Sequence, residues 1–295
     1  MGAARLSKSS GFDTAKWEPG YRVHWRYADE RFAVADWRCD GTGSQTPPSE
    51  EFTRHFEINL HRRGWQVRSV ARQRYFIDPL HHSLWPAGSG FRLSNNTAHR
   101  QAATLLFVDE ALLEESLATV KFANTAALRR LRALPAHWRS SELTTSHARL
   151  LATQAGDRLA LEENSLALIR RVVAEAAGSW DSALYGPPPR RVAAIDDARS
   201  YILSRYREAL SLSSIAAACG VAPSTLCEHF PRVVGMPVWR YVQHLRLQDA
   251  ALALSEGAVD VGRLALDLGF SSHSHFAQAF RAQFGATPSQ FRRSP

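Results

Sequence analysis

The strongest constraint on the fold is the stretch from residue 259 to residue 293, which reads VDVGRLALDLGFSSHSHFAQAFRAQFGATPSQFRR. Its first half has the i, i+3, i+4, i+7 apolar spacing of a short amphipathic helix, carried by Val261, Leu264, Ala265 and Leu268. Gly269 can end that helix in a left-handed conformation, and Ser271 or Ser272 can cap the next one. The second helix has phenylalanines four residues apart and stops at a glycine and a proline. This pattern predicts a helix-turn-helix.

The same pattern occurs once before, from residue 211 to residue 241, as SLSSIAAACGVAPSTLCEHFPRVVGMPVWRY. Five positions of the two copies are in register, with one extra residue in the second turn. They are Gly220, Leu226, Phe230, Gly235 and Tyr241, which match Gly269, Phe276, Phe280, Gly285 and Phe291. Between the copies, apolar residues at helical spacing predict a linker helix. The repetition makes the prediction of two helix-turn-helix units much stronger than a single match.

Two such units joined by a linker helix at the C-terminus resemble the DNA-binding domain of the AraC/XylS family of transcription regulators. The stretches that carry the resemblance are LSLSSIAAACGVAPSTLCEHF, RYVQHLRLQDAALAL and LALDLGFSSHSHFAQAFRAQFGATPSQFRR, in roughly the last third of the chain. The resemblance implies a regulator that reads two successive major grooves of double-stranded DNA. It also implies transcription activation through contact with RNA polymerase.

Composition and cysteine usage limit the class of protein. Hydrophobic residues make up 45% of the 295 residues and charged residues 22%, as in ordinary folded proteins, and the net charge of +8 is compatible with a polyanionic partner. Cys39, Cys219 and Cys227 cannot form a disulfide framework or a zinc site, which favours a reducing cytosol. No apolar run is long enough for a membrane span, and residues 1–15 lack the apolar core of a signal peptide. We therefore expect a disordered tail, no membrane contact and a cytoplasmic protein.

Residues 16–108 contain short strand-like segments separated by turn residues. The candidate strands are 32–37, 56–60, 65–70, 75–77, 82–85, 91–93 and 104–108. Such a series predicts a β-barrel or jelly roll, and the whole chain is therefore expected to be α+β, with an all-α C-terminal domain. This half is similar in architecture and domain order to the cupin-like sensor barrel of AraC/XylS regulators. That resemblance implies a small-molecule effector, whose identity and pocket stay open.

A cupin-type metalloenzyme fused to a DNA-binding domain is the main alternative. Cupin enzymes bind metal through an HxH…E…H set, and this half has no HxH. His81 and His82 are neighbours, so in a strand they point to opposite faces. We therefore expect no metal, no cofactor and no enzymatic activity. A third possibility is an architectural DNA binder with an unliganded barrel.

Residues 109–181 have a helical period and complete a sensor or dimerisation domain, residues 16–181. The resemblance implies that these helices form a homodimer interface; they could equally only cover the open side of the barrel. Residues 182–191 contain three consecutive prolines and are expected to be a linker. The DNA-binding domain then covers 192–295, with helix-turn-helix units at 211–235 and 259–285 and a linker helix at 237–255.

A recognition helix reads base edges with the outward side chains near its N-terminus. In the first copy, burial of the apolar face leaves Ser224, Thr225, Cys227 and Glu228 as candidates. In the second copy, the candidates are His273, Ser274 and Gln278. We expect contacts to phosphates from Arg232, Arg246 and Arg281.

These candidates depart from the commonest reading chemistry. Neither helix has an arginine at a base-reading position, so the usual bidentate contact to guanine is missing. Gln278 can pair with adenine, while Glu228 can accept from cytosine but repels phosphates. Pro231 predicts that the first recognition helix bends or ends there. The second copy is therefore expected to be the more regular reader.

Overall fold

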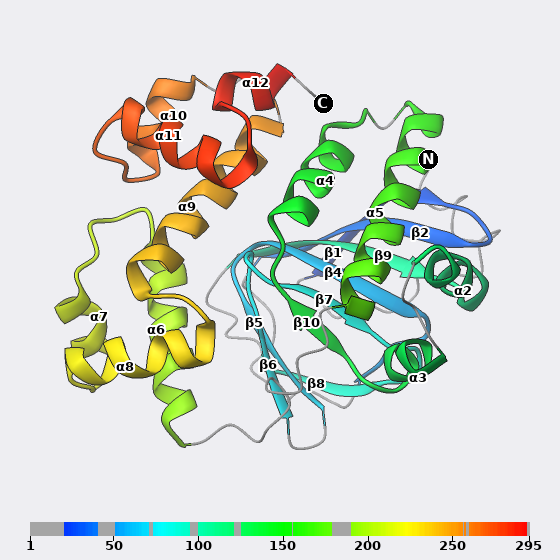
Figure 1. Cartoon of the computed structure of the whole chain (residues 1–295), viewed down its shortest axis with the longest axis horizontal. Helices are drawn as coiled ribbons and strands as arrows, with labels where there is room; N and C mark the ends of the chain where they lie inside the picture. The colour runs from blue at the N-terminus through cyan, green and yellow to red at the C-terminus, as the bar shows by residue number, and fades with distance from the viewer. Residues whose placement is uncertain are drawn as a thin grey trace. The chain divides into compact units, whose positions relative to one another are not determined.

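The computed structural model describes residues 21–40, 51–70, 73–94, 100–120, 125–154, 156–178, 190–255, 257 and 260–293. The chain divides into two units, Met1–Tyr185 and Gly186–Pro295 (Figure 1). The expected tail, 1–15, and most of the expected linker, 182–191, lie outside the described residues. No helix in the described ranges is long and apolar enough to cross a membrane.

The N-terminal unit contains two antiparallel sheets. The six-stranded sheet has the order β1-β2-β9-β4-β7-β10, and the four-stranded sheet has the order β3-β8-β5-β6. The strands are β1 (Tyr21–Ala28), β2 (Phe32–Cys39), β3 (Glu51–Phe52), β4 (Phe56–Arg63), β5 (Gln66–Val70), β6 (Gln73–Ile77), β7 (His82–Trp85), β8 (Gly90–Ser94), β9 (Gln101–Val108) and β10 (Ala136–Trp138). The α+β class is confirmed, but the sheets do not close into a barrel. The expected strands are present, and β1, β3 and β10 are additions, of which β10 pairs with β7.

The two sheets face each other across an aromatic layer. Arg68 of β5 forms an ion pair of 2.6 Å with Glu57 of β4, and the rings of Tyr75 of β6 and Trp85 of β7 lie edge to face with their centroids 5.2 Å apart. Because side chains alternate along a strand, the other face of β4, with Ile58 and its even-numbered neighbours, points away from the second sheet. The second sheet therefore covers one face of the six-stranded sheet and leaves the other face for other elements.

Four helices pack on that other face of the six-stranded sheet (Figure 1). They are α2 (Glu110–Ala118), α3 (Thr125–Ala133), α4 (Ser141–Ala152) and α5 (Arg158–Gly178). Ile58 and Leu60 of β4 share a buried core with Leu112 of α2 and Ile169 of α5. The expectation that helices pack on the β structure is confirmed, since their apolar residues are removed from water by the sheet.

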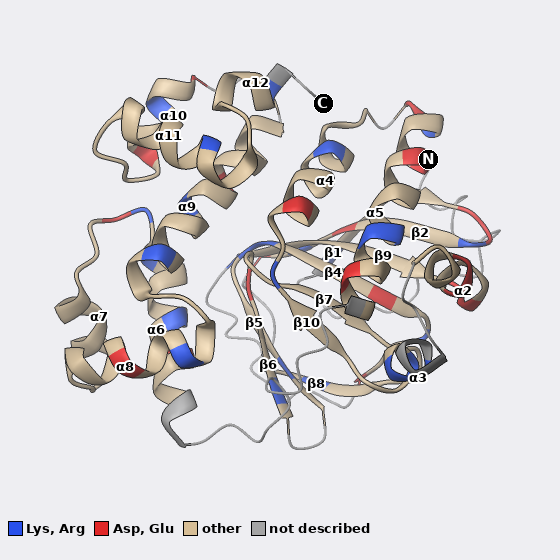
Figure 2. Cartoon of the chain, viewed as in Figure 1, with Lys and Arg blue, Asp and Glu red and all other residues tan. Residues whose placement is uncertain are grey.

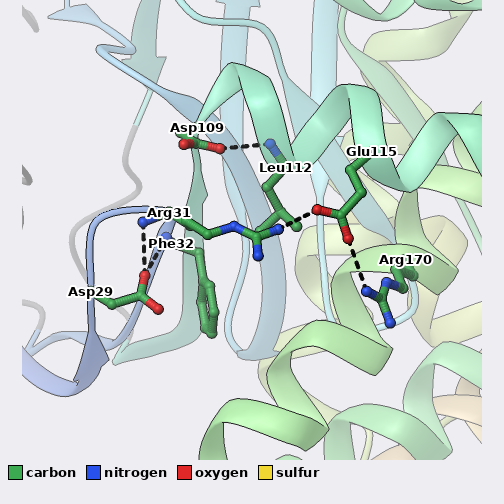
Figure 3. A network of polar contacts seen from close by, with 7 residues as sticks. All are labelled: Asp29, Arg31, Phe32, Asp109, Leu112, Glu115 and Arg170. Carbon is green, nitrogen blue, oxygen red and sulfur yellow. Dashed lines mark hydrogen bonds and ion pairs between the residues drawn. The ribbon is translucent and has the colours of Figure 1, made fainter.

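A polar network holds the β1–β2 turn against two of these helices (Figure 3). Asp29 accepts hydrogen bonds from the backbone N–H groups of Arg31 and Phe32, both at 2.8 Å. The Arg31 side chain then pairs with Glu115 of α2 at 2.5 Å, and Glu115 also pairs with Arg170 of α5 at 3.1 Å. These groups are about half exposed, so the network adds orientation more than stability.

The C-terminal unit is entirely helical in its described residues. It contains α6 (Arg190–Arg205), α7 (Leu212–Ala218), α8 (Pro223–Val234), α9 (Val238–Ser255), α10 (Val261–Asp267), α11 (His273–Phe284) and α12 (Pro288–Arg293). The first helix begins at Arg190, so the last two residues of the expected linker are helical. Tyr241 of α9 packs on Phe230 of α8, while Leu254 of the same helix packs with Phe276 and Phe280 of α11. The linker helix thus contributes to both helix-turn-helix cores.

Candidate DNA interface

The second helix-turn-helix consists of α10 and α11, and the side chain just before each helix caps its N-terminus. Asp260 accepts a hydrogen bond of 3.0 Å from the backbone N–H of Arg263 at the start of α10. In the turn, Gly269 has φ 78°, the left-handed conformation that the sequence predicted. Ser272 caps α11 by accepting from the N–H of His275 at 3.2 Å, so the cap is Ser272 and not Ser271. The outward side chains of α11 therefore start directly after a fixed turn.

The first helix-turn-helix, α7 and α8, closes its turn with an equivalent hydrogen bond, but its turn is one residue shorter and its cap is weaker. The Val221 N–H donates to the Ala216 carbonyl at 3.0 Å, as the Phe270 N–H donates to the Ala265 carbonyl in the second copy. Ala222 precedes α8 and has no side chain to cap it. Both α8 and α11 have 12 residues.

Pro231 does not end the first recognition helix. That helix continues to Val234, and Gly235 then ends it with φ 75°. The proline removes only one backbone hydrogen bond, because it lacks an N–H group. The packing of buried Phe230 and Val234 is enough to hold the last turn of the helix.

The reading face of α11 is exposed as expected from its phase. Phe276 and Phe280 are completely buried, which turns Ser274 and Gln278 toward solvent, while His273 is exposed because it is the first residue of the helix. Gln278 forms no hydrogen bond with any other described residue, so its amide is available for a base. This side chain can offer one donor and one acceptor to the edge of an adenine.

The reading face of α8 is exposed as well, but its charges neutralise each other. Ser224, Cys227 and Glu228 are exposed, and Thr225 is partly buried. Glu228 accepts a hydrogen bond of 2.9 Å from Arg232, one turn later on the same helix. A base-reading candidate and a phosphate-contact candidate are thus paired with each other, which reduces what either offers to DNA.

The register of the two copies shows a second difference in charge. Arg281 of α11 occupies the position of Pro231 in α8, and Gln278 occupies the position of Glu228. Arg281 is exposed and has no ion-pair partner in the described part of the chain. Figure 2 shows basic and acidic residues distributed over the C-terminal helices instead of gathered on one of them. The second reading helix is therefore the one with a free cation beside its base-reading residues.

Arg246 has internal hydrogen-bond partners that the sequence did not indicate. Its guanidinium group lies on α9 and donates to three backbone carbonyls, those of Tyr206 at 2.7 Å, Gly269 at 2.6 Å and Glu208 at 2.8 Å. Burial lowers its pKa below the ordinary arginine value. These bonds commit one N–H group of each guanidinium nitrogen to an internal acceptor, which leaves fewer donors for the expected phosphate contact. The sequence could not reveal this, because the carbonyls belong to segments far from residue 246.

An apolar groove of about 390 Å³ lies between α7, α8 and α9, beside the first reading helix. Its walls include Ile215, Cys227, Pro231 and Val242, and Trp239 at its side is 62% exposed. Arg240 lies over the Trp239 ring at 5.4 Å. Cys227 therefore belongs both to the reading face and to the groove wall, which sequence phase alone did not indicate.

Comparison with known proteins agrees with this geometry. Residues 215–294 match a family model described as a helix-turn-helix domain. The HTH-type transcriptional regulator MtrA of Neisseria gonorrhoeae is 30% identical over 92 residues, which are 31% of this chain and 31% of MtrA. The right origin-binding protein of Escherichia coli is 34% identical over 101 residues, 34% of this chain and 35% of that protein.

A solved structure of a transcriptional regulator with an AraC-type DNA-binding domain, from Chromobacterium violaceum, is 29% identical. It covers 35% of this chain and 91% of its own, with a TM-score of 0.33. The chain spans about a third of the length of the curated relatives above. The C-terminal third of the chain is therefore similar to helix-turn-helix domains of AraC-type transcription regulators.

Proposed function

We propose that the protein is a sequence-specific DNA-binding transcription regulator that works in the cytoplasm and reads two successive major grooves. One observation carries the proposal. Two reading helices of equal length, α8 and α11, are joined by the 18-residue α9, whose two ends belong to the two helix-turn-helix cores. Such a pair suits two grooves on one face of the duplex, roughly 34 Å apart.

The two helices would contribute unequally to recognition. On α11, His273, Ser274 and Gln278 would contact base edges while Arg281 contacts the backbone. On α8, Ser224, Thr225, Cys227 and Glu228 would reach bases with less electrostatic attraction. The exposed side chains and the Glu228–Arg232 ion pair support this asymmetry.

Footprinting tests the proposal directly. Duplexes enriched from a random pool by the full-length protein would be probed with hydroxyl radicals. We expect two protected segments about one helical turn apart on one face of the DNA, roughly 34 Å. Protection of a single groove would contradict two-groove reading, and no enrichment above the random pool would indicate an architectural binder.

The N-terminal unit would be the sensor, because a row of buried polar groups lies between its sheets. Asn59 and His61 lie on the same face of β4 as Glu57, and Glu57 forms an ion pair with Arg68 of the second sheet. Several of these side-chain atoms have no hydrogen-bond partner among the described residues. They are the amide oxygen of the Asn59 side chain, both His61 ring nitrogens, both amide atoms of Gln101 and two Arg68 nitrogens. Buried polar atoms are normally paired, so this row supports an effector site.

The chemistry of the row favours an uncharged effector with both donors and acceptors. Arg68 is neutralised by Glu57, and burial lowers the pKa of His61 to about 3, which leaves the imidazole neutral. The Arg68 guanidinium also lies over the Trp85 and Phe91 rings at 4.7 and 4.5 Å. A thermal-shift screen of small uncharged polar compounds tests this site, with Asn59→Leu as the variant that should lose any hit. A hit that Asn59→Leu retains would place the effector elsewhere.

The remaining partners are proposed on the similarity to MtrA and on the family of the C-terminal domain. We propose contact with RNA polymerase and a homodimer formed through the N-terminal unit; sedimentation of the full-length protein tests the dimer. Against the metalloenzyme alternative, no three His, Cys, Asp or Glu side chains within the described ranges are grouped to hold a metal ion. Metal analysis of the purified protein tests that alternative.

A further inference from the structure

Arg246 lies at the point where three parts of the C-terminal unit meet. It stands in the middle of α9. Figure 1 shows α9 joining the two helix-turn-helix units. Two of its bonds go to the carbonyls of Tyr206 and Glu208, in the connection between α6 and α7. The third goes to the carbonyl of Gly269, in the turn between α10 and α11. One side chain therefore joins the segment that leads into the first helix-turn-helix to the turn of the second helix-turn-helix.

The connection between α6 and α7 is held to α9 by a second set of contacts. The Tyr206 hydroxyl donates to the Asp249 carboxylate at 2.6 Å, and the Arg207 guanidinium pairs with the same carboxylate at 2.6 Å. Asp249 lies three residues after Arg246 and therefore on the same side of α9. Because two neighbouring side chains hold one short segment, that segment has little freedom to move along the helix.

The turn of the second helix-turn-helix lies close against these residues, and only a glycine leaves room for them. A Cβ at Gly269 would stand 2.8 Å from the Arg207 carbonyl oxygen and 2.9 Å from the Arg246 guanidinium. The equivalent Gly220 of the first copy would meet nothing within 4 Å. Gly269 thus meets two requirements, a left-handed backbone and close contact with another segment, while Gly220 meets only the first.

We propose that Arg246 is a positioning residue that fixes the separation and rotation between α8 and α11, so that the protein accepts one spacing between its two half-sites. The inference rests on the proposed two-groove reading. A planar guanidinium with three directed bonds to carbonyls resists both sliding and rotation. One inserted base pair moves the second half-site by about 3.4 Å and turns it by about 35°. A fixed pair of reading helices cannot follow that change.

The test measures binding of the full-length protein to duplexes with altered spacing. The starting duplex is one enriched from a random pool by the wild-type protein, and its half-sites are then moved apart or together by one and two base pairs. We expect wild type to lose about 10-fold or more in affinity at one inserted or removed pair, because the contacts of one helix are lost. Arg246→Met should reduce this loss to about threefold or less, because its helices adjust separately.

Two further measurements separate positioning from other roles. A duplex that keeps only the α11 half-site should bind Arg246→Met and wild type equally. The salt dependence of binding should also stay unchanged, whereas Arg281→Met, the comparison variant, should flatten it by about one unit of slope and leave the spacing profile intact. If Arg246→Met does not fold by circular dichroism, Asp249→Asn is used and should flatten the spacing profile in the same direction.

The outcomes are distinct. A wild-type spacing profile in Arg246→Met, or in Asp249→Asn where the first variant fails to fold, overturns the inference and leaves the proposed function standing. A flattened salt dependence in Arg246→Met also overturns it, because that result identifies a phosphate contact. Failure of wild type to protect two grooves removes the proposed function, and the inference with it.

Discussion

Replacing Gly269 with alanine and comparing the result with Gly220→Ala measures the contact between the second turn and the linker helix. Both glycines have positive φ, 78° and 65°, so alanine costs about 1–2 kcal/mol at either position from backbone strain alone. Only the Gly269 methyl meets other atoms, at 2.8 Å from the Arg207 carbonyl oxygen and 2.9 Å from Arg246. A backbone oxygen cannot easily move aside. Overpacking adds about 1–3 kcal/mol, which gives about 2–5 kcal/mol in total for Gly269→Ala.

Hydrogen–deuterium exchange of the full-length protein, read by mass spectrometry, locates the effect. Gly269→Ala should accelerate exchange in peptides from α10 and α11 and in the connection at residues 206–208. Gly220→Ala should affect only peptides from α7 and α8. The difference between the two variants, about 1–3 kcal/mol, corresponds to roughly a 5- to 150-fold difference in the local opening equilibrium.

Gly285→Ala is the matched control, because Gly285 has φ 74° and nothing within 4 Å of a Cβ. It should behave like Gly220→Ala. Equal destabilisation by all three alanine variants would refute the reasoning, since backbone strain would then explain everything. Unchanged exchange at residues 206–208 in Gly269→Ala would show that the turn does not press on that connection.

Three further predictions concern reading, domain independence and pH. Gln278→Ala should cost about 1–3 kcal/mol of binding free energy at the cognate site and relax the sequence preference at one or two base pairs in a competition assay. Arg281→Ala should instead weaken binding to all sequences. If Gln278→Ala lost the same affinity for every variant site, Gln278 would be a contact to the DNA backbone. The fragment 190–295 should fold and bind DNA alone, because its helices share their own cores; a helical fragment without specific binding would contradict this. His61 has a folded pKa of about 3 against 6.5, so the unfolded state takes up its proton first and stability falls as pH drops below 6.5. His61→Asn should remove about 2 kcal/mol of the destabilisation that urea titration measures between pH 7 and pH 5, and an unchanged pH dependence would argue against the buried neutral ring.

Features that depend on local chain chemistry could be predicted from the sequence. The phase of α11 follows from Phe276 and Phe280, because a helix buries residues four apart on one face. The turn at Gly269 follows from a backbone conformation that other residues adopt only at a cost. The strands and helices of the N-terminal unit were indicated by their periods of 2 and 3.6 residues, since each element must bury one face.

Features that depend on contacts between distant segments were decided only by the tertiary structure. β10 becomes a strand because β7 lies beside it, and Pro231 stays within a helix because packing outweighs one missing hydrogen bond. Arg246 looked like a phosphate contact, but its partners Tyr206 and Gly269 lie 40 and 23 residues away. Periodicity shows which face of an element is buried but not what it is buried against. For a long charged side chain, that partner determines whether it binds DNA or holds the protein together.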